Sequence, residues 1–298
     1  MSLEKKIDFA VIIRVNRANP NGDPLNGNRP RVDYEGYGEI SDVCLKRKIR
    51  NRLLADGHSI FVQSDDNKID GMASLRARAE SDEYGLGKEP FTFHKPKRSD
   101  SASKKLKIRQ ENAFKQENTA KLACEKWFDV RAFGQLFAFS GGDENEGVSI
   151  PIRGPVTIQS AFSVEPVDVA SIQITKSVSG EGDGSKKSSD TMGMKHRVDR
   201  AVYVTCGSMS SQLAERTGFS DDDAEVIKKI LPRLFEGDAS SARPEGSMSV
   251  EEVIWWQHNS KSGQYSSAKV HRTLHVGPDG KYTLDQLDGL EPEEIDGF

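Results

Sequence analysis

Basic side chains gather in one short stretch of the chain and could bind a polyanion. Residues 41–54 hold five cations and one acid: Lys46, Arg47, Lys48, Arg50, Arg52 and Asp42. On a helix, Lys46 and Arg50 lie one turn apart on the same face, where two cations repel unless an anion lies between them. Phosphate is the anion that such a face would bind, because the positive end of the helix dipole adds to the attraction near the helix start. A solvated helix face is the alternative interpretation.

A polar loop precedes this basic stretch. Residues 19–30 contain four Asn, two Gly and three Pro, a composition that favours tight turns and disfavours helix and strand. We therefore expect a loop that is ordered by itself or by a ligand. Asp23 and Asp33 flank it, and two carboxylates near a phosphodiester could hold a metal ion for hydrolysis. Turn capping is the alternative role for both.

Two regular elements must position the loop. Residues 7–15 are apolar at every odd position, which predicts a strand with one buried face. Leu45, Ile49 and Leu53 recur every four residues, which predicts a helix over 41–54 with a narrow apolar stripe. Ser41 or Asp42 can cap that helix. A short strand is expected over 59–63.

The middle of the chain is first basic and then aromatic. Residues 91–109 hold seven cations and little to bury, so we expect mobile surface, with a phosphate contact as the alternative. A helix is expected over 110–127. The aromatic stretch 128–139 includes one cation, Arg131. Its rings could stack on bases, as on sheet-based RNA binders, or fill the core, which is the commoner role.

A long excursion separates two predicted strands. Residues 155–164 alternate cleanly, with Val156, Ile158, Phe162 and Val164 expected on one face, and residues 200–206 form the matching strand. The excursion between them predicts a hairpin whose arm projects. Met192 and Met194 on this basic arm are suited to wedge between bases or to dock on a neighbour. A floppy surface arm is the alternative.

The last third of the chain predicts further packed elements. Residues 220–235 should form a helix that begins with a capping box of Ser220 and Asp223 and is kinked at Pro232. Residues 250–257 predict a packed helix or strand. Residues 268–276 predict a late strand that completes the first sheet, on which His271 and His275 would lie too far apart to share a metal.

Composition excludes several classes of protein. The net charge of −4 argues against simple basic wrapping of nucleic acid, but residues 221–298 carry −8 and the rest +4. Gly22 and Gly27 have the spacing of a nucleotide-binding P-loop, but Asn28 and Arg29 follow where Lys and Ser or Thr are required. The three Cys are far apart and indicate reduced thiols. With no long apolar run, we expect a soluble, cytoplasmic protein without membrane contact. We also expect no cofactor and no metal.

Several segments together resemble one protein family. They are Asn19–Asp23, Asn26–Asp33, Gly36–Gly38, Ser41–Val43, Leu45–Asn51, Phe128–Gly134 and Leu231–Glu236. The chain resembles the backbone subunit of the type I-C CRISPR Cascade complex (the Cas seven family, Csd-two branch), over nearly its whole length.

The resemblance implies an α+β fold with an RRM-like (ferredoxin-like) palm. It implies a single domain over 1–298 with a fingers-like insertion at 56–127, a protruding thumb β-hairpin at 165–199 and an acidic C-terminal tail at 279–298. Copies are expected to stack in a helical filament along a CRISPR RNA, each thumb flipping out one base. The exposed bases pair with target DNA. The other partners would be the five-type, large eight-type and small Cascade subunits.

The same resemblance implies RNA-binding residues. Ser41, Lys46 and Arg50 match the first-helix phosphate contacts of the family, with Arg47 beside them, and the loop around Asn21 and Asn26 should lie beside the guide. The candidates on the thumb are Thr191, Met192, Met194 and Lys195, and Arg131 completes the set.

Three functions are compatible with these observations. The first is a non-catalytic guide-RNA backbone subunit. The second is a metal-dependent ribonuclease of the related type III kind, with Asp23 as its acidic residue. The third is a free-standing RNA-binding module, which would stay monomeric on long RNA.

Overall fold

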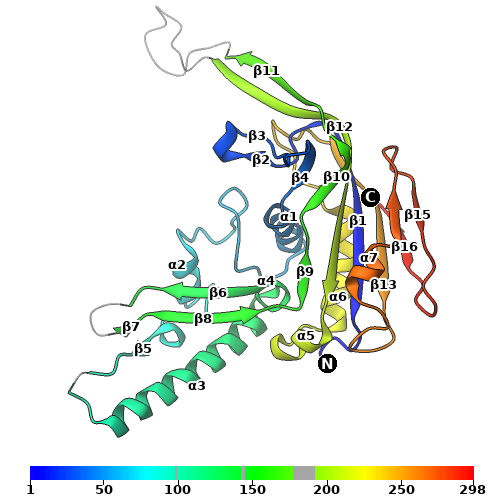
Figure 1. The fold of residues 1–298 in the computed structure, drawn as a ribbon. Coiled ribbons are helices and arrows are strands. Elements are labelled where there is room, and N and C mark those ends of the chain that lie inside the picture. The colour runs from blue at the N-terminus through cyan, green and yellow to red at the C-terminus, as the bar shows by residue number, and fades with distance from the viewer. Residues whose placement is uncertain (98, 142–144, 177–191) are drawn as a thin grey trace, which may run out of the picture.

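The computed structural model describes residues 1–97, 99–141, 145–176 and 192–298. In this described part of the chain, the largest feature is an antiparallel sheet of eight strands, whose main path runs β16-β13-β1-β12-β10-β4 (Figure 1). The strands are β1 (Ile7–Ala18), β4 (Tyr37–Ile40), β9 (Val156–Ile158), β10 (Ala161–Pro166), β11 (Val169–Thr175), β12 (Met192–Met209), β13 (Met248–Gln257) and β16 (Glu293–Asp296). Both β9 and β11 pair with β12.

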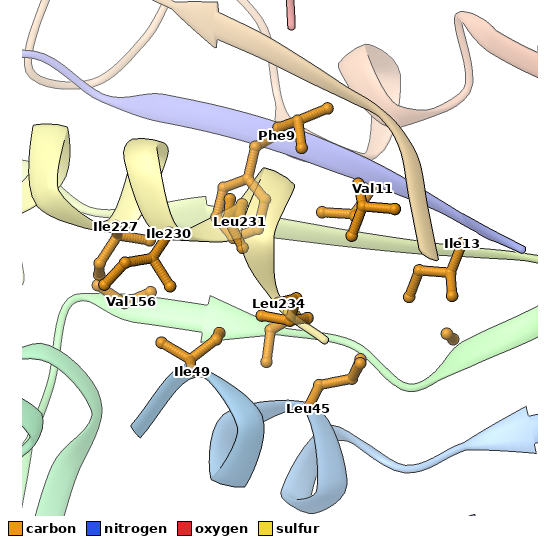
Figure 2. Packing of buried hydrophobic residues seen from close by; sticks show 14 of the residues in the cluster. Phe9, Val11, Ile13, Leu45, Ile49, Val156, Ile227, Ile230, Leu231 and Leu234 are labelled. Carbon is orange, nitrogen blue, oxygen red and sulfur yellow. The ribbon is translucent and has the colours of Figure 1, made fainter. Parts of the chain in front are cut away.

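Two helices cover one face of this sheet. They are α1 (Asp42–Ala55) and α6 (Asp221–Ile230), and the short 3₁₀ helix η4 (Leu231–Arg233) continues α6. Figure 2 shows Phe9, Val11 and Ile13 of β1 facing the apolar stripe of α1 and the apolar residues of α6 and η4. The buried residues in this core include Phe9, Val11, Ile13, Leu45, Ile49, Ile227 and Leu231. Burying each such side chain contributes roughly 1.5–3 kcal/mol, so this core anchors α1 to the sheet.

The C-terminal segment covers part of the opposite face. It contains α7 (Ser267–His271) and the two-stranded ribbon of β14 (Leu274–Val276) and β15 (Tyr282–Leu284). Ala10, Ile254 and Trp256 from the sheet pack there against Val270 and Leu290. The last strand, β16, then pairs with β13 at the edge of the sheet.

A second hydrophobic core lies beside the sheet. Its buried residues run from Phe61 to Ile150 and include Trp127 and Phe137. The elements around it are α2 (Leu75–Glu80), η2 (Glu89–Phe91), β5 (Phe93–His94), α3 (Ala102–Lys126), α4 (Phe128–Phe133), β6 (Gly134–Phe139), β7 (Asn145–Glu146) and β8 (Val148–Arg153). Helix α5 (Ser211–Thr217) follows β12 and contacts α3 and α4. The aromatic rings of 128–139 therefore serve as core, since Phe128 and Phe137 are buried.

The arm predicted between two strands is a β-ribbon. Val169–Thr175 of β11 pairs residue by residue with the first half of β12, and Figure 1 shows this ribbon projecting beyond the sheet. Residues 177–191 lie outside the described residues, and they include Thr191 of the predicted site.

Several sequence expectations are confirmed. The strand at 7–15 is the central strand β1, and the helix at 41–54 is α1 with Ser41 as its N-cap. The capping box of Ser220 and Asp223 is present. Pro232 turns the end of the expected helix into η4.

Other expectations were wrong for identifiable reasons. Residues 59–63 form no strand, because the backbone N–H groups of Phe61 and Val62 donate to the carboxylate of Asp129 instead. Residues 91–109 were expected to be mobile surface. Helix α3 begins at Ala102 with Ser101 as its N-cap, so the basic residues from 102 to 109 are helical. The strand at 155–164 breaks into β9 and β10, and the break turns Phe162 outward to 45% exposure.

The expected late strand at 268–276 was also wrong. Its first half is α7, which Ser266 caps, and its second half pairs with β15 rather than with the large sheet. His271 instead lies against Asp8 and His275 against Asp285. The polar loop at 19–30 contains more structure than predicted, namely β2 (Gly22–Asp23), η1 (Pro24–Asn26) and β3 (Arg29–Pro30).

Candidate nucleic-acid interface

The polar loop is fixed to the start of α1 by one asparagine. Asn21 Oδ1 accepts hydrogen bonds from the backbone N–H of Ser41 (2.9 Å) and from the Ser41 hydroxyl (2.8 Å). The Ser41 hydroxyl in turn accepts from the backbone N–H of Cys44, which caps the helix. A backbone N–H can only donate, so the Asn21 oxygen must face Ser41 and its NH₂ group must point the other way. That NH₂ group makes no hydrogen bond within the described residues and is free to donate to a ligand.

The rest of the loop is held by further short-range contacts. Asn19 donates to the backbone oxygen of Asn28 at 2.7 Å, and the backbone N–H of Arg31 donates to the Asn21 carbonyl at 3.0 Å. Asn28 and Gly27 both have positive φ, 60° and 58°, which a tight turn here requires. Asn26 is exposed at the tip of the loop. The loop is thus ordered without a ligand and presents its tip to solvent.

The two acids beside the loop have capping roles. Asp23 caps η1 by accepting from the backbone N–H of Leu25, and it lies 3.6 Å from Arg31. Asp33 accepts from the backbone N–H groups of Glu35 (2.9 Å) and Tyr37 (2.8 Å). Within the described ranges no group of three or more His, Cys, Asp or Glu side chains is arranged to hold a metal ion.

The cations of α1 fall into two groups. Lys46 pairs with Asp42 (3.0 Å) and Arg47 with Asp66 (2.7 Å), and all four side chains are 26–66% exposed. Exposed pairs of this kind contribute about 0–1 kcal/mol, so both cations can exchange their partner for a phosphate at little cost. Lys46 and Arg47 therefore remain available, whereas Arg52 is 12% exposed and pairs with both Asp56 and Glu236.

Arg50 belongs to the second group. It donates from Nε to Asp129 at 2.9 Å, and Asp129 is 1% exposed. The guanidinium also lies over the ring of Phe133, 5.1 Å from its centroid. Asp129 ties together α1, α4 and residues 61–62, so the structure uses Arg50 to join the two cores.

Lys48 and Arg131 are likewise engaged inside the protein. Lys48 is 3% exposed and pairs with Asp238, and burial lowers the pKa of its ammonium group. Arg131 makes two hydrogen bonds to Asp223, at 2.8 and 3.0 Å, and lies over the ring of Phe128. Asp223 is the residue that closes the capping box of α6, so this pair fixes α4 to α6.

The register of the arm separates its two faces. Cross-strand partners share a face, and the pairs Ser171–His196, Gln173–Met194 and Thr175–Met192 alternate with Ile172–Lys195 and Ile174–Gly193. Met192 and Met194 are 65% and 55% exposed. They therefore share the face of Ser171 and His196, which we call the methionine face, whereas Lys195 lies on the other face.

A hydrogen bond between the polar loop and the arm shows which way the methionine face points. Arg29 of the polar loop donates to Ser171 Oγ at 2.6 Å, and His196 Nδ1 lies 2.9 Å from the same oxygen. The methionine face is thus the one turned toward the polar loop. These contacts join the elements that carry five of the predicted site residues, namely Asn21, Asn26, Lys46, Met192 and Met194. Arg131 lies on α4, which these contacts do not reach.

Sequence reasoning missed three residues of this region. Arg29 and His196 link the loop to the arm. Arg29 lies in a segment that resembles the family, but nothing in the sequence pairs it with a residue of the arm, and His196 carries no motif. Tyr34 is fully exposed on the turn that Asp33 holds rigid, and Val167 at the root of the arm donates to the carbonyl of Gly36 in the same turn. The sequence indicates Tyr34 only as an aromatic residue that lies next to turn-forming residues.

Comparison with known proteins identifies the family. A family model described as "CRISPR-associated protein Cas7" matches residues 5–292. A protein of that name from Haloferax volcanii is 25% identical over 296 residues, covering 95% of this chain and 79% of the relative. Two solved structures are similar in shape. One is a "CRISPR RNA-guided surveillance complex, pre-nicking" (TM-score 0.49, 17% identity, covering 93% of this chain and 84% of the other). The other is a "CRISPR RNA-guided surveillance complex" (TM-score 0.45, 16% identity, 93% and 77%). Because the family model covers almost the full length, the chain belongs to the CRISPR-associated protein Cas7 family.

Proposed function

We propose that this protein is a non-catalytic backbone subunit that binds a CRISPR guide RNA in a type I-C surveillance complex. Its copies stack along the guide and present it to invading DNA. The observation that carries the proposal is the family match over residues 5–292. The expected partners are the guide RNA, target DNA, further copies of the chain and the other subunits of the complex.

The strand order supports an RRM-like palm. In chain order the main elements are β1, α1, β10, β12, α6 and β13, and in the sheet β13, β1, β12 and β10 are successive neighbours. This is a βαββαβ unit with the fourth strand beside the first and the third beside the second, the arrangement of ferredoxin-like folds. The second core would be the fingers and the ribbon of β11 and β12 the thumb.

The guide would be held mainly by its backbone. The NH₂ group of Asn21 and the exposed cations Lys46 and Arg47 supply donors along the polar loop and α1. The methionine face closes over the same loop and offers apolar side chains to an unstacked base. This division leaves Arg50 and Arg131 as structural residues that keep the site in place.

The charge-reversal variant Lys46→Glu with Arg47→Glu tests the site. Each lost phosphate contact on a single strand lowers the slope of log K against log salt by about 0.7. We expect the double variant to bind guide RNA more weakly and with a slope smaller by about 1.4, measured by fluorescence anisotropy from low to moderate salt.

The matched control is Lys261→Glu with Arg272→Glu, which makes the same charge change on the C-terminal segment. It should leave both affinity and slope close to those of the unmodified protein. Equal losses in the two variants would mean that binding follows net charge and not this site.

A ribonuclease activity is tested separately. Asp23 is engaged by the Leu25 N–H and by Arg31, so we expect the bound RNA to stay intact in Mg²⁺. Cleavage that Asp23→Ala abolishes would instead favour the type III alternative.

A further inference from the structure

A short hairpin joins the polar loop to the start of α1. It spans residues 31–39, and Val32 pairs with Gly38 across it. Its second strand is β4, which leads directly into Ser41, the N-cap of α1. The four residues of β4 span roughly 13 Å, so the tip of the hairpin, residues 34–36, lies well away from the donors at the helix start.

The tip of this hairpin is held in one conformation from both sides. The Asp33 carboxylate accepts from the backbone N–H groups of Glu35 (2.9 Å) and Tyr37 (2.8 Å). Gly36 has a φ of 89°, which this tight turn requires, and its carbonyl accepts from the backbone N–H of Val167 at 2.9 Å. A side chain on this tip is therefore presented by a rigid backbone and needs no ordering of the chain to meet a ligand.

The tip presents one aromatic ring to solvent. Tyr34 is fully exposed, and its hydroxyl makes no hydrogen bond within the described residues. Val32, 45% exposed, is the other large apolar side chain that the hairpin exposes, and Asp33 and Glu35 on either side of the ring are polar and exposed. So small an apolar surface is a poor docking site for another protein, which needs a contiguous patch. A single flat ring suits a single flat partner.

The root of the arm lies beside this tip. Tyr37 pairs with Pro166 at the end of β10, and β11 of the arm begins three residues further on, at Val169. On the methionine face of the arm, Ser171 accepts from Arg29 of the polar loop. The hairpin tip, the polar loop and the methionine face are thus joined by direct contacts. A strand held between the loop and the methionine face is therefore brought next to the ring of Tyr34.

We propose that Tyr34 stacks on one unpaired nucleobase of the guide RNA; the inference rests on the proposed function. Aromatic side chains are the usual stacking platform for bases of a single strand, and they accept any sequence because every base has a flat π-face. A tyrosine has only two side-chain torsions to fix, so on a rigid turn the contact costs little conformational entropy. Met192 and Met194 offer flexible apolar side chains to a base, whereas Tyr34 offers a flat surface on which a base rests.

Substitutions of Tyr34 combined with abasic RNA test the stacking directly. Affinities are measured by fluorescence anisotropy on oligoribonucleotides short enough to bind one copy of the full chain. Tyr34→Ala should weaken binding by about tenfold, Tyr34→Phe should retain it, and Tyr34→Leu, which keeps apolar bulk without a flat ring, should lose most of it. An abasic nucleotide is then placed at each position in turn. At the stacked position it should weaken binding to the unmodified protein by about tenfold and abolish the difference between that protein and Tyr34→Ala.

The matched control is Tyr84→Ala, which removes another exposed tyrosine, between α2 and η2, and should not change the affinity. Full affinity in Tyr34→Ala or in Tyr34→Leu, or equal losses in Tyr34→Ala and Tyr84→Ala, overturns the inference alone. So does a loss in Tyr34→Ala that stays the same on every abasic RNA, because the ring would then act on the protein and not on a base. Absence of RNA binding by the unmodified protein contradicts the proposed function as well.

Discussion

Arginine and lysine side chains of the same helix serve different purposes in this protein, and burial of the partner decides which. Lys46 and Arg47 have exposed carboxylate partners and can release them. Arg50 faces a carboxylate that is 1% exposed and cannot be released without leaving a buried charge. Helical spacing in the sequence places Lys46 and Arg50 on one face, but Asp129 is 79 residues further on. Sequence reasoning could therefore identify the cations of the helix but not which of them are free to bind a phosphate.

Arg50→Ala should lower the free energy of unfolding by about 3 kcal/mol, because it leaves Asp129 buried without its cation. Urea unfolding followed by circular dichroism measures the change. The comparison is Arg47→Ala, whose exposed pair predicts a loss below about 1 kcal/mol. Equal effects of the two substitutions would show that Asp129 is satisfied by its backbone donors alone.

At the scale of elements, the sequence predicts most of the strands and helices that position the candidate site. The alternation in β1, the four-residue spacing in α1 and the excursion before β12 all appear as expected. The contact between the polar loop and the arm could not be predicted, since Arg29 and Ser171 are 142 residues apart and no sequence pattern pairs the two. The C-terminal cover of the sheet was missed because α7 is short and its apolar residues alternate like a strand.

The two faces of the arm should differ in RNA binding. Met192→Ala with Met194→Ala should weaken binding by at least about tenfold, because burying even one of the two Met side chains contributes roughly 1.5–3 kcal/mol. Ile172→Ala with Ile174→Ala removes a similar exposed apolar area from the opposite face and should change the affinity for a single protein copy little. Titration of a short oligoribonucleotide compares them. A larger loss from the isoleucine pair would reverse the assignment of faces.

A buried carboxylate ties the C-terminal segment to β1 and should make its attachment depend on pH. Asp8 lies 2.8 Å from His258 and 2.9 Å from Lys6. Burial alone would raise the pKa of Asp8, but hydrogen bonds from His258, His271, Ser267 and Lys6 outweigh it and hold the pKa well below its usual range. Because the folded pKa is depressed, this stabilisation is present above the unfolded pKa of about 3.9 and is lost as the pH falls below it.

Asp8→Asn should therefore reduce the free energy of unfolding by roughly 2 kcal/mol at pH 7. It should also reduce the further loss of stability between about pH 5 and pH 3 relative to the unmodified protein. Urea unfolding at several pH values measures both. Parallel curves for the two proteins across the acid range would exclude Asp8 as a source of the pH dependence.

At the scale of the whole molecule, the low net charge is compatible with the proposed repeated subunit and argues against a protein that wraps nucleic acid alone. The net charge is −4, and a few exposed donors on the loop and α1 are sufficient when many copies share one strand. Acidic residues of the C-terminal part are ordered in the sheet and contact the same chain, as Glu293 does with Lys228 at 2.6 Å. None of the helices in the described ranges has the length and hydropathy needed to span a bilayer.

The most direct test of the central claim is the number of protein copies bound to RNAs of increasing length. Mass photometry at low ionic strength counts them on a series of guide-like oligoribonucleotides. If the protein is a guide-RNA backbone subunit, the number of copies rises in regular steps with RNA length, and high salt disassembles the complex. A single copy on every length, or no binding at low ionic strength, would contradict the account.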